Sequence, residues 1–281
     1  MPTISPLSTV SLPLGLRALQ RWEFPRKLGL CERLYGDSLR RFGIRWVRTA
    51  TGLIWKLDLA NPTHRWMVYG SYEGPGFWRW LRTQPAPALI VDSGANIGQT
   101  IVHFAHSAPA TPILAFEPGQ AAREWLAECV AANALDRVRI FPTALGAGRG
   151  TAYLQDNLNP HHHGSWNHVH PTDGVPVVLT TLDDELAAHG HGEVSIWKLD
   201  LEGYELAALH GAAGAPAARR IRAIYMEVSP NPASAASRSF LRGYGYNPHR
   251  IADSGRLGRP VGGENYDNLL FLCPGHPARR P

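Results

Sequence analysis

The stretch Ala88–Thr100, which reads A-L-I-V-D-S-G-A-N-I-G-Q-T, decides the fold of this chain. An apolar run is followed by a turn rich in glycine and then by a run compatible with a helix. This order predicts a buried strand, a tight turn and a helix. The parts are the strand Ala88–Val91, the turn residues Asp92, Gly94, Asn96 and Gly98, and the helix Gln99–His106.

The turn has the residue types of a ligand-binding loop. Glycine permits positive φ and lets the backbone approach a ligand, and the first N–H groups of a helix favour a negatively charged group. Asp92, at the carboxyl end of the strand, either orients the turn or accepts a hydrogen bond from an ammonium or hydroxyl group of a ligand. A glycine-rich turn without any ligand is the alternative interpretation.

A second apolar run, Ile113–Phe116, ends in Glu117 and Pro118. An acidic residue at the tip of the second strand is typical of sites that hold the two hydroxyl groups of a ribose. The ligand is therefore expected to contain a ribose.

Five ordered motifs resemble those of the FkbM-type S-adenosylmethionine-dependent methyltransferases, over roughly Tyr69 to Cys273. The motifs are D-S-G-A-N-I-G (Asp92–Gly98), F-E-P (Phe116–Pro118), T-L-D-D (Thr181–Asp184), K-L-D-L-E-G-Y-E (Lys198–Glu205) and Y-M-E-V (Tyr225–Val228). Ser93 departs from the family, which more often has an apolar residue there.

The resemblance implies an α/β fold of class I methyltransferases. Its Rossmann-like sheet has seven strands, the last one antiparallel, with helices on both faces. We expect residues 69–281 to form this domain and residues 1–68 to form a basic helical and hairpin extension. The implied reaction is O-methylation, with S-adenosyl-L-methionine as the donor and a hydroxyl of a sugar or natural-product scaffold, a small molecule or glycan, as the acceptor.

The resemblance also assigns residues to the cofactor. Asp92, Gly94, Asn96 and Gly98 are expected around the methionine moiety, and Glu117 with Pro118 at the ribose. Ala144, after the third strand Val138–Phe141, is expected near the adenine, and Asp200 near the cofactor as well. Tyr72 and Glu73 are possible contacts at the methionine end, although aromatic packing and a helix cap explain them equally well.

Charged residues cluster at the tip of the fourth strand, Val194–Leu199. An extended backbone places Lys198, Asp200 and Glu202 on one side, and three charges in a buried strand require partners or a function. Asp200 is the candidate base that activates the acceptor hydroxyl, and Lys198, Glu202 and Glu227 arrange charge or acceptor. Asp200 and Glu227 alternatively share a Mg²⁺ ion.

The N-terminal region is basic and partly helical. Leu14–Arg48 contains nine Arg or Lys against three acidic residues, and Leu30–Phe42 has helical spacing. Its apolar side is expected to pack on the catalytic domain, with Met1–Pro13 frayed. A platform for a phosphorylated, carrier-bound or membrane-associated substrate is the alternative. A hairpin is predicted over Arg45–Leu59.

The remaining pattern predicts elements and one irregular loop. We expect helices over Gln120–Asn133, Thr181–His189, Tyr204–His210 and Ser234–Tyr244, a strand over Ala223–Val228, an antiparallel pair Thr151–Leu154 with Val175–Thr180, and a closing antiparallel pair Tyr246–Ile251 with Asn268–Cys273. Five histidines between His161 and His170 lack regular ligand spacing. This favours an exposed loop, or a mobile loop that covers the acceptor, and makes a metal site the less favoured interpretation.

Composition narrows the class of protein. The three cysteines are far apart, so we expect no disulfide framework and a reducing compartment, with Cys129 and Cys273 in the core. No apolar run reaches the roughly 18 residues of a membrane helix, and the first residues lack the pattern of a signal peptide, which predicts a cytoplasmic protein. The net charge of +5 permits acidic partners but does not predict a nucleic-acid partner.

Other activities remain open at this stage. A catalytically inactive S-adenosylmethionine-binding module and a nicotinamide-dependent oxidoreductase share the strand, the glycine turn and the ribose acid, although G-A-N-I-G-Q differs from G-x-G-x-x-G. A nucleic-acid methyltransferase is a further alternative, although no recognised nucleic-acid motif accompanies the catalytic motifs of this chain. Methylation of a nitrogen or of a carboxylate also stays open, because neither reaction needs a strong base. The sequence does not identify the acceptor or the oligomeric state.

Overall fold

The computed structural model describes residues 9–24, 26–70, 73–155, 168–170, 172–259 and 267–275. Its largest sheet contains β4 (Ile90–Ser93), β5 (Ile113–Phe116), β6 (Val138–Phe141), β11 (Val194–Leu199), β12 (Ile221–Val228), β13 (Asn247–Ile251), β14 (Leu257–Gly258) and β15 (Asp267–Leu272). The strand order is β14-β13-β15-β12-β11-β4-β5-β6. The chain therefore runs from β4 outward to β6 and then returns to the other side of β4 at β11.

The pairing within this sheet is mixed. Five neighbouring strands run parallel to one another, in the order β6, β5, β4, β11 and β12. The strand β15 is antiparallel to both of its neighbours, β12 and β13. The predicted closing pair is confirmed, and the sheet has the predicted seven strands with the two-residue β14 added at one edge. Reversal of strand order at β4 and β11 creates a switch point, where ligands of open α/β sheets bind.

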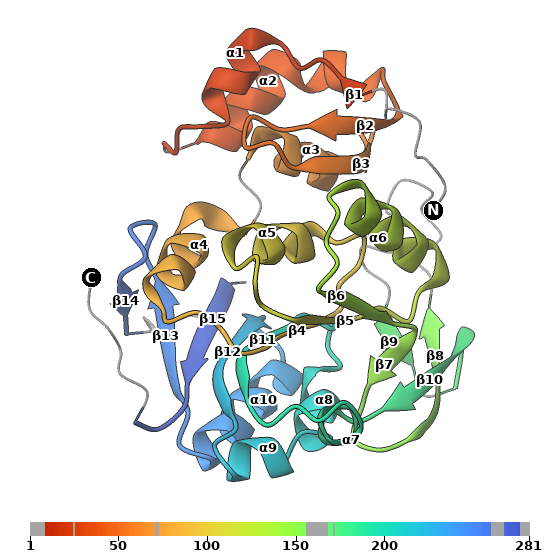
Figure 1. The fold of residues 1–281 in the computed structure, drawn as a ribbon, viewed down its shortest axis with the longest axis vertical. Helices are drawn as coiled ribbons and strands as arrows, with labels where there is room; N and C mark the ends of the chain where they lie inside the picture. Colours follow the sequence, from red (N-terminus) through yellow and green to blue (C-terminus); the bar gives the residue numbers. More distant parts are fainter. Residues whose placement is uncertain are drawn as a thin grey trace.

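Helices cover both faces of the sheet (Figure 1). One face packs against α4 (Gly74–Thr83), α5 (Gln99–Ser107) and α6 (Gln120–Ala132). The other packs against α7 (Leu182–Ala188), α8 (Glu205–His210), α9 (Gly214–Ala217) and α10 (Pro232–Gly243). Successive strand side chains alternate between the two layers: Ile90 contacts the α5 side and Val91 the α8 side.

A smaller sheet lies beside β6. It contains β7 (Thr143–Leu145), β8 (Gly150–Gln155), β9 (His168–His170) and β10 (Val175–Thr180) in the order β7-β10-β8-β9. The predicted antiparallel pairing of residues 151–154 with 175–180 is confirmed by the β8–β10 ladder. The segment that holds His161, His162 and His163 lies outside the described residues, and His170 Nδ1 accepts from the backbone N–H of Asp173 at 3.1 Å.

The N-terminal residues form a compact layer above α5 and α6 (Figure 1). This layer contains β1 (Thr9–Val10), α1 (Leu14–Leu19), α2 (Lys27–Arg40), β2 (Ile44–Arg48), β3 (Ile54–Asp58) and α3 (Pro62–Tyr69). The predicted hairpin is present as β2 and β3. Fraying through Pro13 is wrong for the described part, because Thr9 and Val10 pair in parallel with β2.

The apolar side of this layer packs on the rest of the chain, as predicted. Leu16 and Trp55 belong to the same buried cluster as Val102 of α5 and Trp125 and Cys129 of α6. Cys129 and Cys273 are buried free thiols, also as predicted. Within the described chain, no helix combines the length and hydropathy that a membrane span requires.

Candidate active site

The glycine turn after β4 fits against the end of β11 because Gly94 has no side chain. Gly94 has φ of +81° and Asn96 has φ of +49°. A Cβ atom on Gly94 would lie 2.0 Å from the carbonyl oxygen of Asp200, so only glycine permits this packing. The turn therefore places the start of α5 beside the polar tip of β11, across the switch point of the sheet.

Glu117 connects the turn to the tip of β5. Its carboxylate accepts hydrogen bonds from the backbone N–H of Asn96 at 2.8 Å and of Gly119 at 2.7 Å. Burial raises the pKa of Glu117 to about 7, against the effect of these two donors. A buried acid fixed in this way is suited to accept from a pair of ligand hydroxyls.

A cavity of about 450 Å³ opens over these strand ends, a size typical of small-molecule sites. Its wall includes most of the residues predicted for the site: Glu73, Gly94, Asn96, Glu117, Pro118, Ala144, Lys198, Asp200, Glu202 and Glu227. Tyr72 lies outside the described residues. Asp92 and Gly98 are not part of this wall, and Gly98 instead caps α5 and packs against Leu126.

Asp92 lies behind the cavity wall, fully buried. The Thr100 hydroxyl donates to Asp92 Oδ2, while Oδ1 has no hydrogen-bond partner in the described chain. Burial raises the pKa of this carboxyl, opposed by the nearby Lys198. Ser93, the departure from the family pattern, accepts from Trp197 Nε1 at 2.7 Å, so its hydroxyl is satisfied inside the core.

Lys198 is the centre of a buried charge network. Its Nζ donates to Asp200 Oδ2 at 2.8 Å and lies 3.9 Å from Glu73 Oε1. Asn268 Nδ2 donates to the other Glu73 oxygen at 3.1 Å. Burial raises the pKa of Glu73 to about 7, although Lys198 opposes the shift. The ammonium thus holds two carboxylates that come from distant parts of the sequence.

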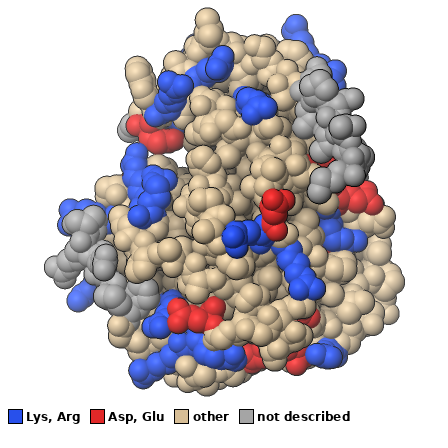
Figure 2. Space-filling view, in the orientation of Figure 1, with Lys and Arg blue, Asp and Glu red and all other residues tan. Residues whose placement is uncertain are grey.

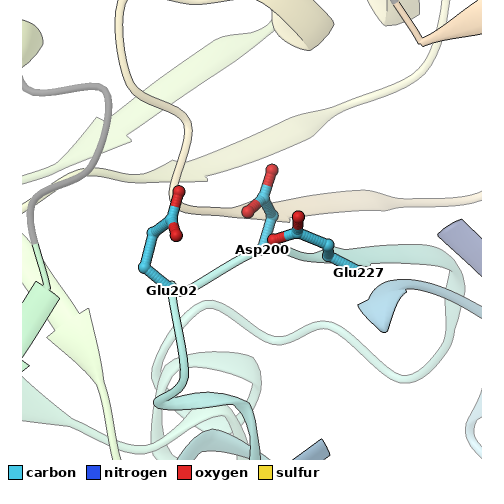
Figure 3. A group of neighbouring side chains, drawn as sticks. All are labelled: Asp200, Glu202 and Glu227. Carbon is cyan, nitrogen blue, oxygen red and sulfur yellow. The ribbon is translucent and has the colours of Figure 1, made fainter. Parts of the chain in front are cut away.

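Three acidic side chains meet at the tips of β11 and β12 (Figure 3). Ligand oxygens of Asp200, Glu202 and Glu227 all lie within 4.8 Å of one another, close enough to share one divalent cation. Desolvation, and then repulsion from neighbouring carboxylates, raises the pKa of Glu202 to about 7 and that of Glu227 to about 8. The cluster therefore binds protons readily, or a positively charged group in their place.

The predicted extended backbone through Glu202 is wrong. β11 ends at Leu199, and Glu202 has φ of +51° in the turn that leads to α8. Glu202 nevertheless lies beside Asp200 because the turn folds back, and not because charged residues alternate along a strand. The alternation correctly predicts only the pair Lys198 and Asp200, which are hydrogen-bonded.

A substrate platform was one alternative for the N-terminal region, but the sequence assigned none of its residues to the cavity wall. Leu28 of α2 and Thr63 and Trp66 of α3 form part of its wall, and Trp66 is 40% exposed. Gln99, Tyr204 and Asn268 are further wall residues absent from the prediction. A helix signal for α3 does exist, because Asn61 precedes Pro62 and its side chain caps the Thr63 N–H at 2.9 Å.

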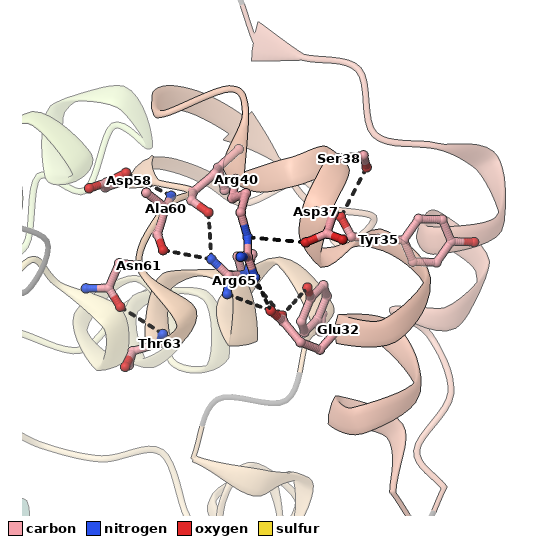
Figure 4. Close-up of polar contacts among 12 residues, drawn as sticks. Glu32, Tyr35, Asp37, Ser38, Arg40, Asp58, Ala60, Asn61, Thr63 and Arg65 are labelled. Atoms are coloured by element: carbon pink, nitrogen blue, oxygen red, sulfur yellow. Dashed lines mark hydrogen bonds and ion pairs between the residues drawn. The ribbon is translucent and has the colours of Figure 1, made fainter.

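An ion pair between a buried arginine and a half-buried glutamate fixes α3 to α2 (Figure 4). Arg65, with a side chain only 3% exposed, donates to Glu32 Oε1 at 2.6 Å and to the carbonyl oxygens of Leu59 and Ala60. Tyr69 donates to the other Glu32 oxygen at 2.7 Å. These donors lower the pKa of Glu32. The network orients the helix that presents Trp66 to the cavity.

Comparison with known proteins gives a family and a set of distant folds. The family model described as the methyltransferase FkbM domain matches residues 92–248, and no curated protein is detectably similar to this chain. Solved structures include a precorrin-6y C5,15-methyltransferase from Geobacter metallireducens GS-15, 9% identical over 69% of this chain and 82% of that one, with a TM-score of 0.40.

Two further structures are a putative O-methyltransferase from Klebsiella pneumoniae and the human methyltransferase 10 domain containing protein. The former is 13% identical over 71% of this chain and 79% of that one, with a TM-score of 0.42. The latter is 13% identical over 87% of this chain and 97% of that one, with a TM-score of 0.45. Because these TM-scores are below 0.5, the fold is assigned from the strand order of the sheet and not from the superposition on these structures.

Proposed function

Because this chain belongs to the FkbM methyltransferase family, whose model matches more than half of its 281 residues, we propose that it methylates a hydroxyl group of a sugar or natural-product scaffold. Membership of the family implies S-adenosylmethionine as the donor. The observation that supports a hydroxyl acceptor is Asp200, a partly exposed carboxylate on the cavity wall beside the glycine turn.

The residues of the cavity fit S-adenosylmethionine. Glu117 offers its buried carboxylate to the ribose hydroxyls, and Gly94 and Asn96 offer backbone at the methionine end. Ala144 and Leu145 provide apolar wall for the adenine. Asp92 Oδ1 is a buried acceptor with no partner among the described residues. When bound, the cofactor supplies a methyl group already activated by its positive sulfonium.

Asp200 then acts as the base. It would accept the proton of the acceptor hydroxyl while the bound cofactor supplied the methyl group. Lys198 orients Asp200 through the 2.8 Å hydrogen bond. Glu202 and Glu227 line the same cavity, where they would favour a positively charged group, and the proton would leave Asp200 to solvent after transfer.

Methyl transfer in the Asp200→Asn variant tests this role. Purified protein with radiolabelled S-adenosylmethionine is assayed against a panel of sugar and polyketide alcohols. With any acceptor that the wild type methylates, Asp200→Asn should lower the rate about 100-fold or more while binding of S-adenosylhomocysteine persists. Glu128→Gln, at an exposed ion pair on α6, is the matched control. An unchanged rate in Asp200→Asn would show that it is not the base.

A cation-assisted version is the second candidate, and the 4.8 Å grouping of Asp200, Glu202 and Glu227 favours it. Here the carboxylates bind Mg²⁺, which lowers the pKa of the acceptor hydroxyl. Chelation with EDTA followed by return of Mg²⁺ separates the two versions. Loss and recovery of methyl transfer supports the cation, whereas an unaffected rate supports Asp200 as the base.

A nucleic-acid acceptor has less support. On the face shown in Figure 2, Lys and Arg side chains are scattered among acidic residues and do not gather into one basic patch. The cavity wall itself is acidic, with Glu73, Asp200, Glu202 and Glu227 against the single described cation Lys198. Phosphate groups near the methyl donor are disfavoured by such a wall.

A further inference from the structure

The N-terminal layer holds most of the large apolar side chains that the described residues expose to solvent. Seven of the nine such side chains lie in this layer, and the other two, Val175 and Val178, lie on β10. The most exposed in the layer are Leu14 at 80%, Trp22 at 66% and Leu34 at 58%. Single exposed apolar residues are ordinary on a protein surface, but several of them on one small layer indicate a surface for interaction.

The outward side of α1 combines apolar and basic side chains. Four exposed residues recur with the spacing of one helix face: Leu14, Arg17, Arg21 and Trp22. Backbone hydrogen bonds of helical turns continue past the end of α1 as far as the N–H of Trp22, so the same face continues to this residue. Leu16, on the opposite side, is fully buried.

The outward side of α2 has the same character. Leu30, Arg33 and Leu34 are exposed, and their spacing makes them neighbours on one helix face. Cys31 and Leu39, on the other face of α2, are fully buried. Both helices therefore present arginine together with large apolar side chains to solvent.

The two outward sides form one surface. The buried sides of α1 and α2 belong to a single core cluster, which contains Leu16, Cys31 and Leu39. The two helices also meet directly, since a Cβ on Gly15 would lie 2.5 Å from the Tyr35 hydroxyl oxygen. Their outward sides therefore lie together, at the end of the molecule that is farthest from the main sheet (Figure 1).

This surface has a net positive charge. All eight arginines between residues 14 and 48 are exposed, and basic side chains lie over the top of Figure 2, where the N-terminal layer is. Two of the three acidic residues in this segment pair with buried basic groups: Glu23 with Lys27, and Glu32 with Arg65. Asp37 is the remaining acid, so exposed arginines greatly outnumber exposed carboxylates.

An anionic membrane surface matches both properties of these helices. Arginine binds lipid phosphate groups, and tryptophan and leucine insert among the headgroups and the first part of the acyl chains. A nucleic-acid surface would use the positive charge but would leave Leu14, Leu30 and Leu34 in water. We propose that the outward face of α1 and α2 docks on the surface of an anionic phospholipid bilayer.

Docking in this way leaves the main cavity open. Leu28 lines the cavity from α2, and its position in the helix is on the side opposite to Leu30 and Leu34. Binding of a bilayer and binding of the cofactor therefore use different sides of the same helix. The inference does not depend on the methyltransferase activity, and its test is independent of any methyl acceptor.

Co-sedimentation of the full-length protein with lipid vesicles tests the proposal. Vesicles of equimolar phosphatidylcholine and phosphatidylglycerol are compared with vesicles of phosphatidylcholine alone, at about 0.1 M salt. We expect partitioning into the anionic vesicles to be stronger by about tenfold or more, and to weaken as the salt concentration rises.

Paired variants locate the docking face. Arg21→Gln/Arg33→Gln should weaken partitioning by about tenfold or more, because two arginines leave the face. The matched control Arg82→Gln/Arg242→Gln removes two exposed arginines outside the N-terminal layer and should change partitioning by less than about twofold. Circular dichroism and urea denaturation verify that each variant is folded.

Insertion of Trp22 provides a second measurement that does not depend on the charge variants. Vesicles whose acyl chains bear bromine quench the fluorescence of a tryptophan that enters the bilayer. They should quench the wild type, and Trp22→Phe should remove most of this quenching while the protein still sediments with the vesicles.

Four results would overturn the inference. Equal partitioning into both kinds of vesicle, or none, excludes an anionic bilayer, and equal losses in the two double variants exclude this face. Self-association that Leu34→Ser abolishes, without vesicle binding, would assign the face to a second copy of the chain. Binding of mixed-sequence RNA that Arg21→Gln/Arg33→Gln weakens, again without vesicle binding, would assign it to nucleic acid.

Discussion

Replacement of Gly94 by alanine should both destabilise the fold and abolish cofactor binding. The added Cβ would lie 2.0 Å from the Asp200 carbonyl oxygen and 3.2 Å from its carbon. Both are backbone atoms, so no side-chain rotation relieves the overlap. Either the glycine turn or the end of β11 must move, and each carries residues of the cavity.

The magnitude follows from two separable costs. Alanine at φ of +81° costs about 1 to 2 kcal/mol, and the overlap with fixed backbone adds about 1 to 3 kcal/mol. Gly190→Ala isolates the first cost, since Gly190 has φ of +67° and a Cβ there meets nothing within 4 Å. The free energy of unfolding should therefore fall by about 2 to 5 kcal/mol in Gly94→Ala and by about 1 to 2 kcal/mol in Gly190→Ala.

Urea denaturation followed by circular dichroism gives the two free energies, and calorimetric titration gives the affinity for S-adenosylhomocysteine. Gly190→Ala should bind like the wild type, whereas Gly94→Ala should bind at least tenfold more weakly even where it remains folded. Equal stabilities for the two variants, with normal binding by both, would refute the packing of the turn on β11 as the feature that shapes the site.

Three further predictions concern other parts of the molecule. Arg65→Met removes the ion pair with the half-buried Glu32 and leaves two carbonyl oxygens without their donor, so it should cost about 2 to 4 kcal/mol in urea denaturation. The exposed Arg40→Met should cost less than about 1 kcal/mol, and equal costs would contradict the network. The pKa of Glu227 is raised to about 8 in the folded protein, so ionisation of Glu227 destabilises the fold as the pH rises from the ordinary pKa of glutamate through 8. The Tm of Glu227→Gln should therefore exceed that of the wild type by more at pH 8.5 than at pH 5, and an equal difference at both pH values would contradict this. Trp66→Ala should weaken binding of S-adenosylhomocysteine or of the acceptor several-fold, because Trp66 lines the cavity. Trp22→Ala, at an exposed position away from the cavity, should leave binding unchanged, and equal affinities in the two variants would show that α3 is not part of the site.

The sequence predicted the central part of the site because its signals are local. An apolar run, a glycine turn and an acid at the next strand tip follow each other within thirty residues, and their geometry depends on backbone rules alone. The closing antiparallel pair β13 and β15 was predicted from the glycine-rich connection between the two strands and from the family resemblance.

Other features depend on contacts between distant segments. Trp66 reaches the cavity only because Arg65 binds Glu32, thirty-three residues earlier, and no local pattern encodes that pairing. Asn61 and Pro62, which directly follow the predicted hairpin, begin α3, a helix that was not predicted. Glu202 was predicted from strand alternation, but a turn with positive φ brings it to the carboxylate cluster. Glu73 was a possible contact at the methionine end, whereas its contacts with Lys198 and Asn268 depend on the fold.

The most direct measurement of the central claim is calorimetric titration of the wild type and of Glu117→Ala with S-adenosylhomocysteine, alongside NAD and NADP. We expect micromolar binding of S-adenosylhomocysteine alone, weakened at least tenfold by the substitution, because Glu117 is the buried acceptor for the ribose hydroxyls. Preference for a nicotinamide nucleotide, or no binding of S-adenosylhomocysteine, would contradict the assignment of this cavity to the methyl donor.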